Sequence, residues 1–159
     1  MKYSIREATA KDMEYVLELI KELATFEKEA SAVEISADDL VRDGFGPEKL
    51  FHCFVAESNS KIVGMALIYK RYSTWKGPII HLEDLVVSES MRGSGLGTAL
   101  LNEVVKYCAK LGVKRINWEV LDWNEPAIAF YEKKGARVLR DWDVVQLDEK
   151  GIQNYIKNI

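Results

Sequence analysis

The sequence has little of what would mark it as anything other than an ordinary globular protein. Its 159 residues include two cysteines, two histidines and three prolines, and 22 basic residues nearly balance 25 acidic ones. The resulting net charge of −3 disfavours nucleic acid as a partner, because nucleic-acid-binding proteins carry basic surfaces. No run approaches the roughly 18 apolar residues of a membrane helix, and the N-terminus lacks an apolar signal core. We therefore expect no nucleic-acid or membrane partner and a cytoplasmic location.

The few cysteines and histidines do not form a recognisable metal site. Cys53 and Cys108 stand in apolar contexts, and His52 and His81 both fall in stretches expected to be strands. Neither pair has the short, regular spacing of zinc ligands. We expect two buried free thiols and no metal.

Apolar periodicity predicts a mixed α/β fold around one twisted sheet flanked by helices. There is no linker or repeat, so we expect a single domain over residues 1–159. The expected strands cover residues 3–6, 51–57, 61–72, 79–87, 115–120 and 143–147. The expected helices cover residues 13–24, 36–42, 96–111, 124–134 and 149–159.

A glycine-rich turn, 92–97, joins the expected strand at 79–87 to the helix that follows it. Free backbone N–H groups and the helix dipole make such a helix start an anion site, and glycines let the anion approach closely. A dinucleotide fingerprint counted from Gly93 would require glycine where Thr98 stands, and no Gly-Lys pair of a P-loop follows. What remains is Arg-x-x-Gly-x-Gly, read either as a phosphate site or as a purely structural turn.

This turn resembles the acyl-CoA pyrophosphate loop of the GCN5-related N-acetyltransferases, and the order of expected elements is similar to theirs. Within that family the chain looks most like the diamine (spermidine/spermine-type) acetyltransferases. The segments that carry this resemblance include Leu82-Glu83-Asp84, Trp123-Asn124-Glu125-Pro126 and Phe130-Tyr131. The resemblance implies an acyl-CoA N-acyltransferase fold with a mostly antiparallel sheet. It also implies acetyl-CoA as cofactor, a small amine acceptor that attacks directly in a ternary complex, and a homodimer.

Acetyl transfer to an amine needs a base for the ammonium proton, a donor for the thioester oxygen and an acid for the leaving thiolate. Glu83 is the candidate base, because a charged pair within an apolar strand is costly unless it has a use. Strand alternation places its neighbour Asp84 on the other face, as a structural or supporting charge. The resemblance assigns the role of acid to Tyr131 and the oxyanion donor to the Val87 N–H. The alternatives are an ion-paired glutamate and a packing tyrosine.

The resemblance also assigns the groups that bind the cofactor. Asn124 would contact the pantetheine arm, or act only as a helix N-cap. The full set expected to bind acetyl-CoA is Leu85, Val86, Val87, Arg92, Gly93, Ser94, Gly95, Leu96, Gly97, Thr98, Asn124, Pro126 and Tyr131.

The expected acceptor site draws on Phe26, Glu27, Trp75, Glu83 and Asp84. Glu27 would hold a second ammonium, or belong to a solvated face, and Trp75 would line the acceptor channel or cover the edge of the core. Ser73 stands where the polyamine pattern has an acidic residue, and the acidic pattern near residues 140–142 is also altered. Thialysine, lysine-like amines and short diamines therefore stay open as acceptors.

Two other functions remain compatible with the sequence. The acceptor could be a protein lysine or N-terminus, or the chain could bind acyl-CoA without catalysis. Retention of Glu83, Tyr131 and the whole turn argues against the second.

Overall fold

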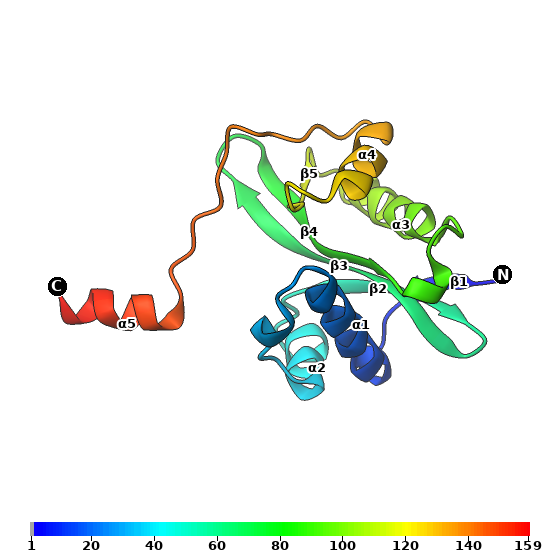
Figure 1. The fold of residues 1–159 in the computed structure, drawn as a ribbon, viewed down its shortest axis with the longest axis horizontal. Coiled ribbons are helices and arrows are strands. Elements are labelled where there is room, and N and C mark those ends of the chain that lie inside the picture. The colour runs from blue at the N-terminus through cyan, green and yellow to red at the C-terminus, as the bar shows by residue number, and fades with distance from the viewer. Residues whose placement is uncertain (1) are drawn as a thin grey trace. The chain divides into compact units, whose positions relative to one another are not determined.

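The computed structural model describes residues 2–159, in which five strands and five α-helices follow one another with three short 3-10 turns (Figure 1). In chain order they are β1 (Ser4–Glu7), α1 (Met13–Phe26), α2 (Ala37–Phe45), β2 (His52–Ser58), β3 (Lys61–Ser73), β4 (Gly77–Val87), α3 (Leu96–Leu111), β5 (Ile116–Asn117), α4 (Glu125–Lys133) and α5 (Glu149–Lys157).

The strands form one sheet in the order β1-β2-β3-β4-β5. The first four strands pair antiparallel, whereas β5 runs parallel to β4. This confirms the predicted mixed α/β fold with a mostly antiparallel sheet. The expected strand over 115–120 shortens to the two residues of β5, because only Ile116 and Asn117 pair with β4.

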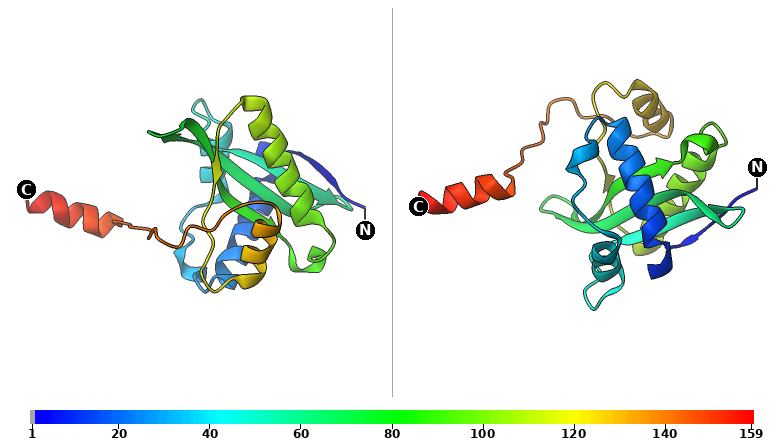
Figure 2. Two further views of the ribbon diagram at one scale, coloured as in Figure 1. Left: turned by 90° about the horizontal axis from the view of Figure 1, so that it is seen from above. Right: turned by 60° about the horizontal axis from the view of Figure 1, so that its bottom comes forward.

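The two faces of the sheet are covered by different helices (Figure 2). On one face, α1 and α2 supply Met13, Val16, Leu19 and Leu40 to a core that includes Val86 of β4. The periodic apolar residues of α1 thus lie on one side of the helix, as expected. On the other face α3 packs against β2, β3 and β4.

Gly64 of β3 lets α3 come close to the sheet. A Cβ at this position would lie 3.0 Å from the Val86 carbonyl oxygen and 3.1 Å from Leu100. At its two ends α3 is bounded by Gly95 and Gly112, which both have left-handed backbone conformations. The helix that starts at the glycine turn is therefore held firmly against the strand that leads into the turn.

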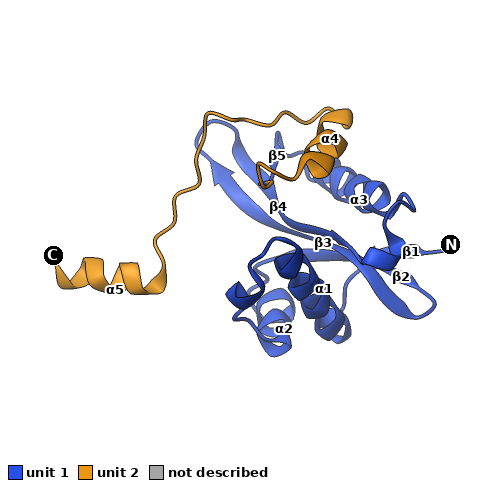
Figure 3. Cartoon of the chain, in the orientation of Figure 1, with its two compact units in different colours: residues 1–119 blue, residues 120–159 orange. Residues whose placement is uncertain are grey.

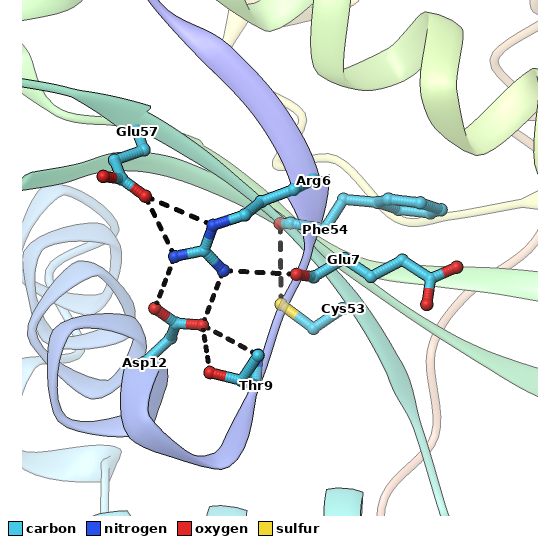
Figure 4. Close-up of polar contacts among 7 residues, drawn as sticks. All are labelled: Arg6, Glu7, Thr9, Asp12, Cys53, Phe54 and Glu57. Carbon is cyan, nitrogen blue, oxygen red and sulfur yellow. Dashed lines mark hydrogen bonds and ion pairs between the residues drawn. The ribbon is translucent and has the colours of Figure 1, made fainter. Parts of the chain in front are cut away.

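A network of charges fastens the edge strand β1 to its neighbours (Figure 4). The Arg6 guanidinium donates to both carboxylate oxygens of Asp12, at 2.8 and 2.9 Å, and to Glu57 of β2, at 3.0 Å. The backbone N–H of Thr9 also donates to Asp12, at 2.7 Å, and completes a capping box at the start of the helical turn. These bonds, Arg6 foremost, lower the pKa of Asp12 to about 2.

The chain divides into two compact units, residues 1–119 and 120–159 (Figure 3). The single domain over 1–159 stays a prediction. Within the second unit, the expected strand at 143–147 is wrong: this stretch has no regular structure, and Val144, Val145 and Leu147 are 61, 91 and 59% exposed. Alternation alone does not make a strand, because a strand also needs a partner for its backbone groups. Over residues 2–159, every helix is too short or too polar to cross a membrane.

Candidate active site

The glycine turn has a backbone conformation that few residues other than glycine adopt. Gly93 and Gly95 adopt φ values of 75° and 83°, in the left-handed region that side chains disfavour. A Cβ at either position would meet no atom within 4 Å, so the turn is open on the side where these glycines lie. The first N–H groups of α3 have no acceptor within the helix. The turn therefore offers an open backbone cradle at a helix N-terminus, which suits a diphosphate.

Within the turn, Ser94 stabilises the backbone, because its hydroxyl donates to the Met91 carbonyl at 2.6 Å. Leu96 is buried and anchors the first turn of α3 to the sheet. Gly97 lies against β4, since a Cβ there would be 3.7 Å from Val87 Cγ2. Thr98 is half-buried in the first turn of the helix.

Arg92 precedes the turn, and a carboxylate on α1 holds it. Its guanidinium lies 3.5 Å from Glu22 and 5.7 Å from the centre of the Phe26 ring. The same Glu22 carboxylate accepts a hydrogen bond of 3.0 Å from the backbone N–H of Glu89, just before the turn. Sequence reasoning missed Glu22, because 70 residues separate it from Arg92 and only the fold brings them together.

The edge of β4 next to the turn is open on one side. In the described sheet, β5 pairs only with Ile80 and His81, so residues 82–87 of β4 have a strand neighbour on the β3 side alone. Val86 is buried in the core, while Leu85 and Val87 are half-buried. An open strand edge can pair with an extended ligand through its backbone groups. The predicted contact of this strand with a pantetheine arm fits this edge.

Glu83 occupies a bulge in β4. Leu67 of β3 pairs with Asp84 and Ile68 pairs with Leu82, so Glu83 is the extra residue between two ladder pairs. Bulges redirect a side chain and recur next to active sites. The Glu83 carboxylate is about half exposed, within reach of solvent and of a ligand. The strict alternation that placed Glu83 and Asp84 on opposite faces is interrupted here.

Asp84 belongs to a group of acidic residues that repel one another. Burial, followed by the negative charges of Glu83 and Glu27, raises the pKa of Asp84 to about 6. Burial also raises the pKa of Glu27, which directly follows α1. A carboxylate with a raised pKa is stabilised by any cation that enters. Glu27, Glu83 and Asp84 are here called the acidic cluster, and their charges would suit a positively charged amine.

The other two expected acceptor residues are exposed. Phe26 is 43% exposed at the end of α1, and Trp75 is 77% exposed in the turn between β3 and β4. Ser73 has a local structural role, because its hydroxyl accepts hydrogen bonds from the backbone N–H groups of Trp75 and Lys76, at 3.2 and 3.3 Å. The departure from the polyamine pattern at this position thus shapes the hairpin turn.

Three expected site residues lie on α4, in the second unit. Asn124 is the N-cap of this helix, and its side-chain oxygen accepts from the Ala127 N–H at 3.3 Å. Pro126 occupies the first turn, where its missing N–H costs nothing. Tyr131 is half-buried, with its ring edge-on to Phe130 at 5.2 Å. Contacts of Asn124, Pro126 and Tyr131 with acetyl-CoA stay predictions.

Sequence reasoning also passed over His81, which is buried in β4 with its Nε2 atom 3.6 Å from Glu83.

Both cysteines are free and buried, as expected. Among residues 2–159, no three His, Cys, Asp or Glu side chains are grouped as metal ligands.

Comparison with known proteins agrees with this geometry. Residues 13–136 match the acetyltransferase (GNAT) family. The chain is 39% identical over 145 residues to thialysine N-epsilon-acetyltransferase of Mus musculus, covering 86% of this chain and 85% of that one. It is 37% identical over 130 residues to the enzyme of the same name from Caenorhabditis elegans, with coverages of 82% and 80%. It is also 36% identical over 141 residues to spermidine/spermine N(1)-acetyltransferase-like protein 1 of Homo sapiens, covering 84% of this chain and 20% of that protein.

Solved structures share the fold at lower identity. An integron cassette protein from the mobile metagenome of V. cholerae has a TM-score of 0.80 at 22% identity and covers 99% of both chains. An aminoglycoside acetyltransferase from an uncultured soil metagenomic sample, in complex with sisomicin, has a TM-score of 0.71 at 17% identity, with coverages of 91 and 97%. The family match over most of the chain and the identity to the named relatives show that the chain belongs to the acetyltransferase (GNAT) family and is an N-acetyltransferase.

Proposed function

We propose that this enzyme transfers the acetyl group of acetyl-CoA to a primary amine of a small acceptor that carries a second positive charge, a diamine, polyamine or thialysine-like molecule. The observation that carries this proposal is the acidic cluster, in which burial raises the pKa of Glu27, and burial together with the charges of Glu83 and Glu27 raises the pKa of Asp84. An ammonium group on the acceptor would relieve this repulsion. The names of the relatives, which include thialysine and spermidine/spermine acetyltransferases, support the same class of acceptor.

Acetyl-CoA, which members of this family generally use, fits the residues present. The open cradle of Gly93 and Gly95 and the first N–H groups of α3 would hold the diphosphate, with Arg92 beside them. The open edge of β4 would pair with the pantetheine arm, and α4 would contribute Asn124, Pro126 and Tyr131. When bound, the thioester supplies an activated acyl carbon.

The residues of the chain then have separate tasks. Glu83 takes a proton from the acceptor ammonium onto a carboxylate oxygen, through a water molecule, and leaves the nitrogen lone pair free to attack. Its partial exposure lets it release that proton to solvent. The Val87 N–H would donate to the thioester oxygen, and the Tyr131 hydroxyl would supply a proton to the departing sulfur. Attack takes place directly, with both substrates bound.

We also propose that two copies of the chain form a homodimer. The exposed apolar side chains of the second unit support this, since burial of apolar surface against another chain is favourable. They include Trp142, Val144, Val145 and Leu147, followed on α5 by Ile152, Tyr155 and Ile156. Sedimentation velocity of the wild type and of Val145→Asp tests this proposal. A wild type that stays monomeric at micromolar concentration would contradict it.

The test of the function is release of CoA thiol from acetyl-CoA in the presence of a panel of small amines. We expect turnover with diamines or thialysine-like amines and a lower rate in Tyr131→Phe. The exposed carboxylate Glu29 gives a matched control, because Glu29→Gln removes a negative charge two residues from Glu27 without changing the acidic cluster. Acetylated lysines in a protein mixture, detected by mass spectrometry, with no turnover of any small amine would overturn the proposed acceptor class.

A further inference from the structure

His81 is buried behind Glu83, and both of its ring nitrogens face polar groups. The residue lies in β4 and is only 5% exposed. Its Nδ1 atom lies 3.2 Å from Nδ2 of Asn117, the residue that β5 pairs with it. Its Nε2 atom lies 3.6 Å from Oε2 of Glu83. The imidazole thus bridges an amide on β5 and the carboxylate proposed as the base.

The amide of Asn117 selects the tautomer of this histidine. Its Nδ2 group can only donate, so Nδ1 of His81 accepts and the ring proton is on Nε2. The N–H then points toward the Glu83 carboxylate. With the amide turned over, Oδ1 would accept from Nδ1 instead, and the Nε2 lone pair would face the carboxylate, which is repulsive. Asn117 Oδ1 is buried without a hydrogen-bond partner in the described structure, so the amide orientation argued here rests on the repulsion that the other orientation would create at Glu83.

The ring is also fixed from the side. Tyr69 of β3 is the cross-strand partner of His81, and the two rings lie 5.0 Å apart. Burial, and then the negative charge of Glu83, raises the pKa of Tyr69, so the Glu83 side chain lies close to both rings. Tyr69 and Asn117 therefore confine His81, while the bulge sets the backbone of Glu83.

The charges around His81 favour a neutral ring. Burial is the main cause that lowers its pKa, and the positive charge of Arg71 on β3 lowers it further. The negative charges of Glu83 and Glu119 raise the pKa of His81, but by less than burial lowers it. At neutral pH the ring is therefore a neutral N–H donor.

We propose that His81 is a positioning residue for Glu83: its Nε2–H orients the carboxylate and keeps it ready to accept the ammonium proton of the acceptor. This rests on the proposed role of Glu83 as the base. The distance of 3.6 Å between His81 Nε2 and Glu83 Oε2 is longer than a hydrogen bond. A rotation of the exposed Glu83 side chain that moves its carboxylate by about half an ångström would bring the two atoms within hydrogen-bonding distance. The geometry thus assigns to His81 and Asn117 a part in the reaction that neither had from sequence alone.

The test compares His81→Phe with His81→Gln. Phenylalanine keeps a planar ring but removes the donor, whereas the side-chain amide of glutamine places an N–H near the position of Nε2. We expect His81→Phe to lose about 10–100-fold in kcat/KM toward a diamine, with the acid limb of its pH profile moved to higher pH. We expect His81→Gln to recover most of the rate. Calorimetry should give the same Kd for CoA in both variants, because the cradle is at the other end of β4.

Two further measurements keep failure of this inference distinct from failure of the proposed function. In Glu83→Gln, loss of activity supports the base role, and addition of His81→Phe to that variant should then cause little further loss. If Glu83→Gln is inactive but His81→Phe has the wild-type rate and pH profile, the inference on His81 fails alone. If Glu83→Gln is as active as the wild type, both fail. Nitrogen-15 NMR of the wild type reports the tautomer directly, even where His81→Phe does not fold, and a proton on Nδ1 would overturn the proposal.

Discussion

Two groups of carboxylates in this enzyme lie in opposite electrostatic surroundings. Asp12 and Glu57 share the Arg6 guanidinium, and the pKa of Asp12 falls to about 2 (Figure 4). In the acidic cluster, burial and neighbouring negative charge raise the pKa of Asp84 to about 6. Both groups lie in the first unit and are partly buried, so burial alone does not distinguish them.

The difference lies in the partner. Arg6 neutralises the carboxylates of Asp12 and Glu57, and these ion pairs stabilise the fold by connecting β1 to its neighbours. Among residues 2–159, no arginine forms such a fork with the acidic cluster, and the raised pKa of Asp84 costs stability at neutral pH until a cation binds. Groups with raised pKa values in this kind of setting are typical of functional sites. The comparison predicts that substitutions in the two groups affect different properties.

The largest expected effect is on the rate, in Glu83→Gln. Loss of a general base lowers kcat by about 100–1000-fold, since the amide cannot accept a proton. Steady-state CoA release measures this, with the exposed Glu29→Gln as the matched control at near wild-type rate. A Glu83→Gln variant within threefold of the wild type would contradict the role of the base.

The next effect is on stability, in Arg6→Ala. This change leaves Asp12 partly buried without its cation, and we expect a loss of about 2–3 kcal/mol in the free energy of unfolding. Urea denaturation at pH 7 measures it. Since the folded-state pKa of Asp12 is lowered, its contribution is present above its unfolded pKa near 3.8 and is lost as pH falls toward about 2.

The control for Arg6→Ala is Arg42→Ala, because Arg42 is 66% exposed and pairs with Asp39 and Asp43 at the surface. We expect Arg42→Ala to leave stability nearly unchanged. Equal losses in the two variants would mean that the Arg6 network is only another surface ion pair.

Whereas Arg6→Ala should destabilise the protein, Asp84→Asn should stabilise it at high pH. The folded-state pKa of Asp84 is raised from 3.8 to about 6, so its contribution is favourable below 3.8 and is lost as pH rises through about 6. At pH 8 the asparagine should therefore stabilise the protein by roughly 2–3 kcal/mol, while at pH 4 the two proteins should be nearly equal. Urea denaturation at both pH values tests this, and a destabilised variant at pH 8 would show that another group compensates Asp84.

The smallest effect is expected in Glu27→Gln, which removes a charge at the edge of the acidic cluster. We expect KM for a diamine to rise about 3–10-fold with little change in kcat, because one partly exposed ion pair with the substrate is worth about 1 kcal/mol. Glu29→Gln, two residues along the same segment and exposed, is the control. A fall in kcat without a change in KM would assign Glu27 to the chemistry instead.

Local patterns predicted much of the fold. The apolar spacing over residues 13–24 predicts the buried side of α1, and the helix over 96–111 begins after the glycine turn where the sequence predicts it. The expected strand at 143–147 is wrong, because alternation in the sequence carries no information on whether a partner strand is present.

The features that sequence reasoning missed depend on contacts between distant residues. Glu22 reaches Arg92, and Asn117 reaches His81, only after the sheet and its helices have assembled. The bulge at Glu83 arises from the register between β3 and β4, which no residue within β4 signals by itself. Which of the two carboxylates at 83 and 84 is exposed is therefore a property of the folded sheet.

The central claim is that the acceptor supplies a cation that neutralises the acidic cluster. The most direct test compares kcat/KM for a four-carbon diamine with that for the monoamine in which a methyl group replaces the second ammonium. We predict that the wild type prefers the diamine by at least about tenfold, worth about 1.4 kcal/mol, and that Glu27→Gln combined with Asp84→Asn loses most of this preference. Equal kcat/KM for the two amines in the wild type would contradict the claim.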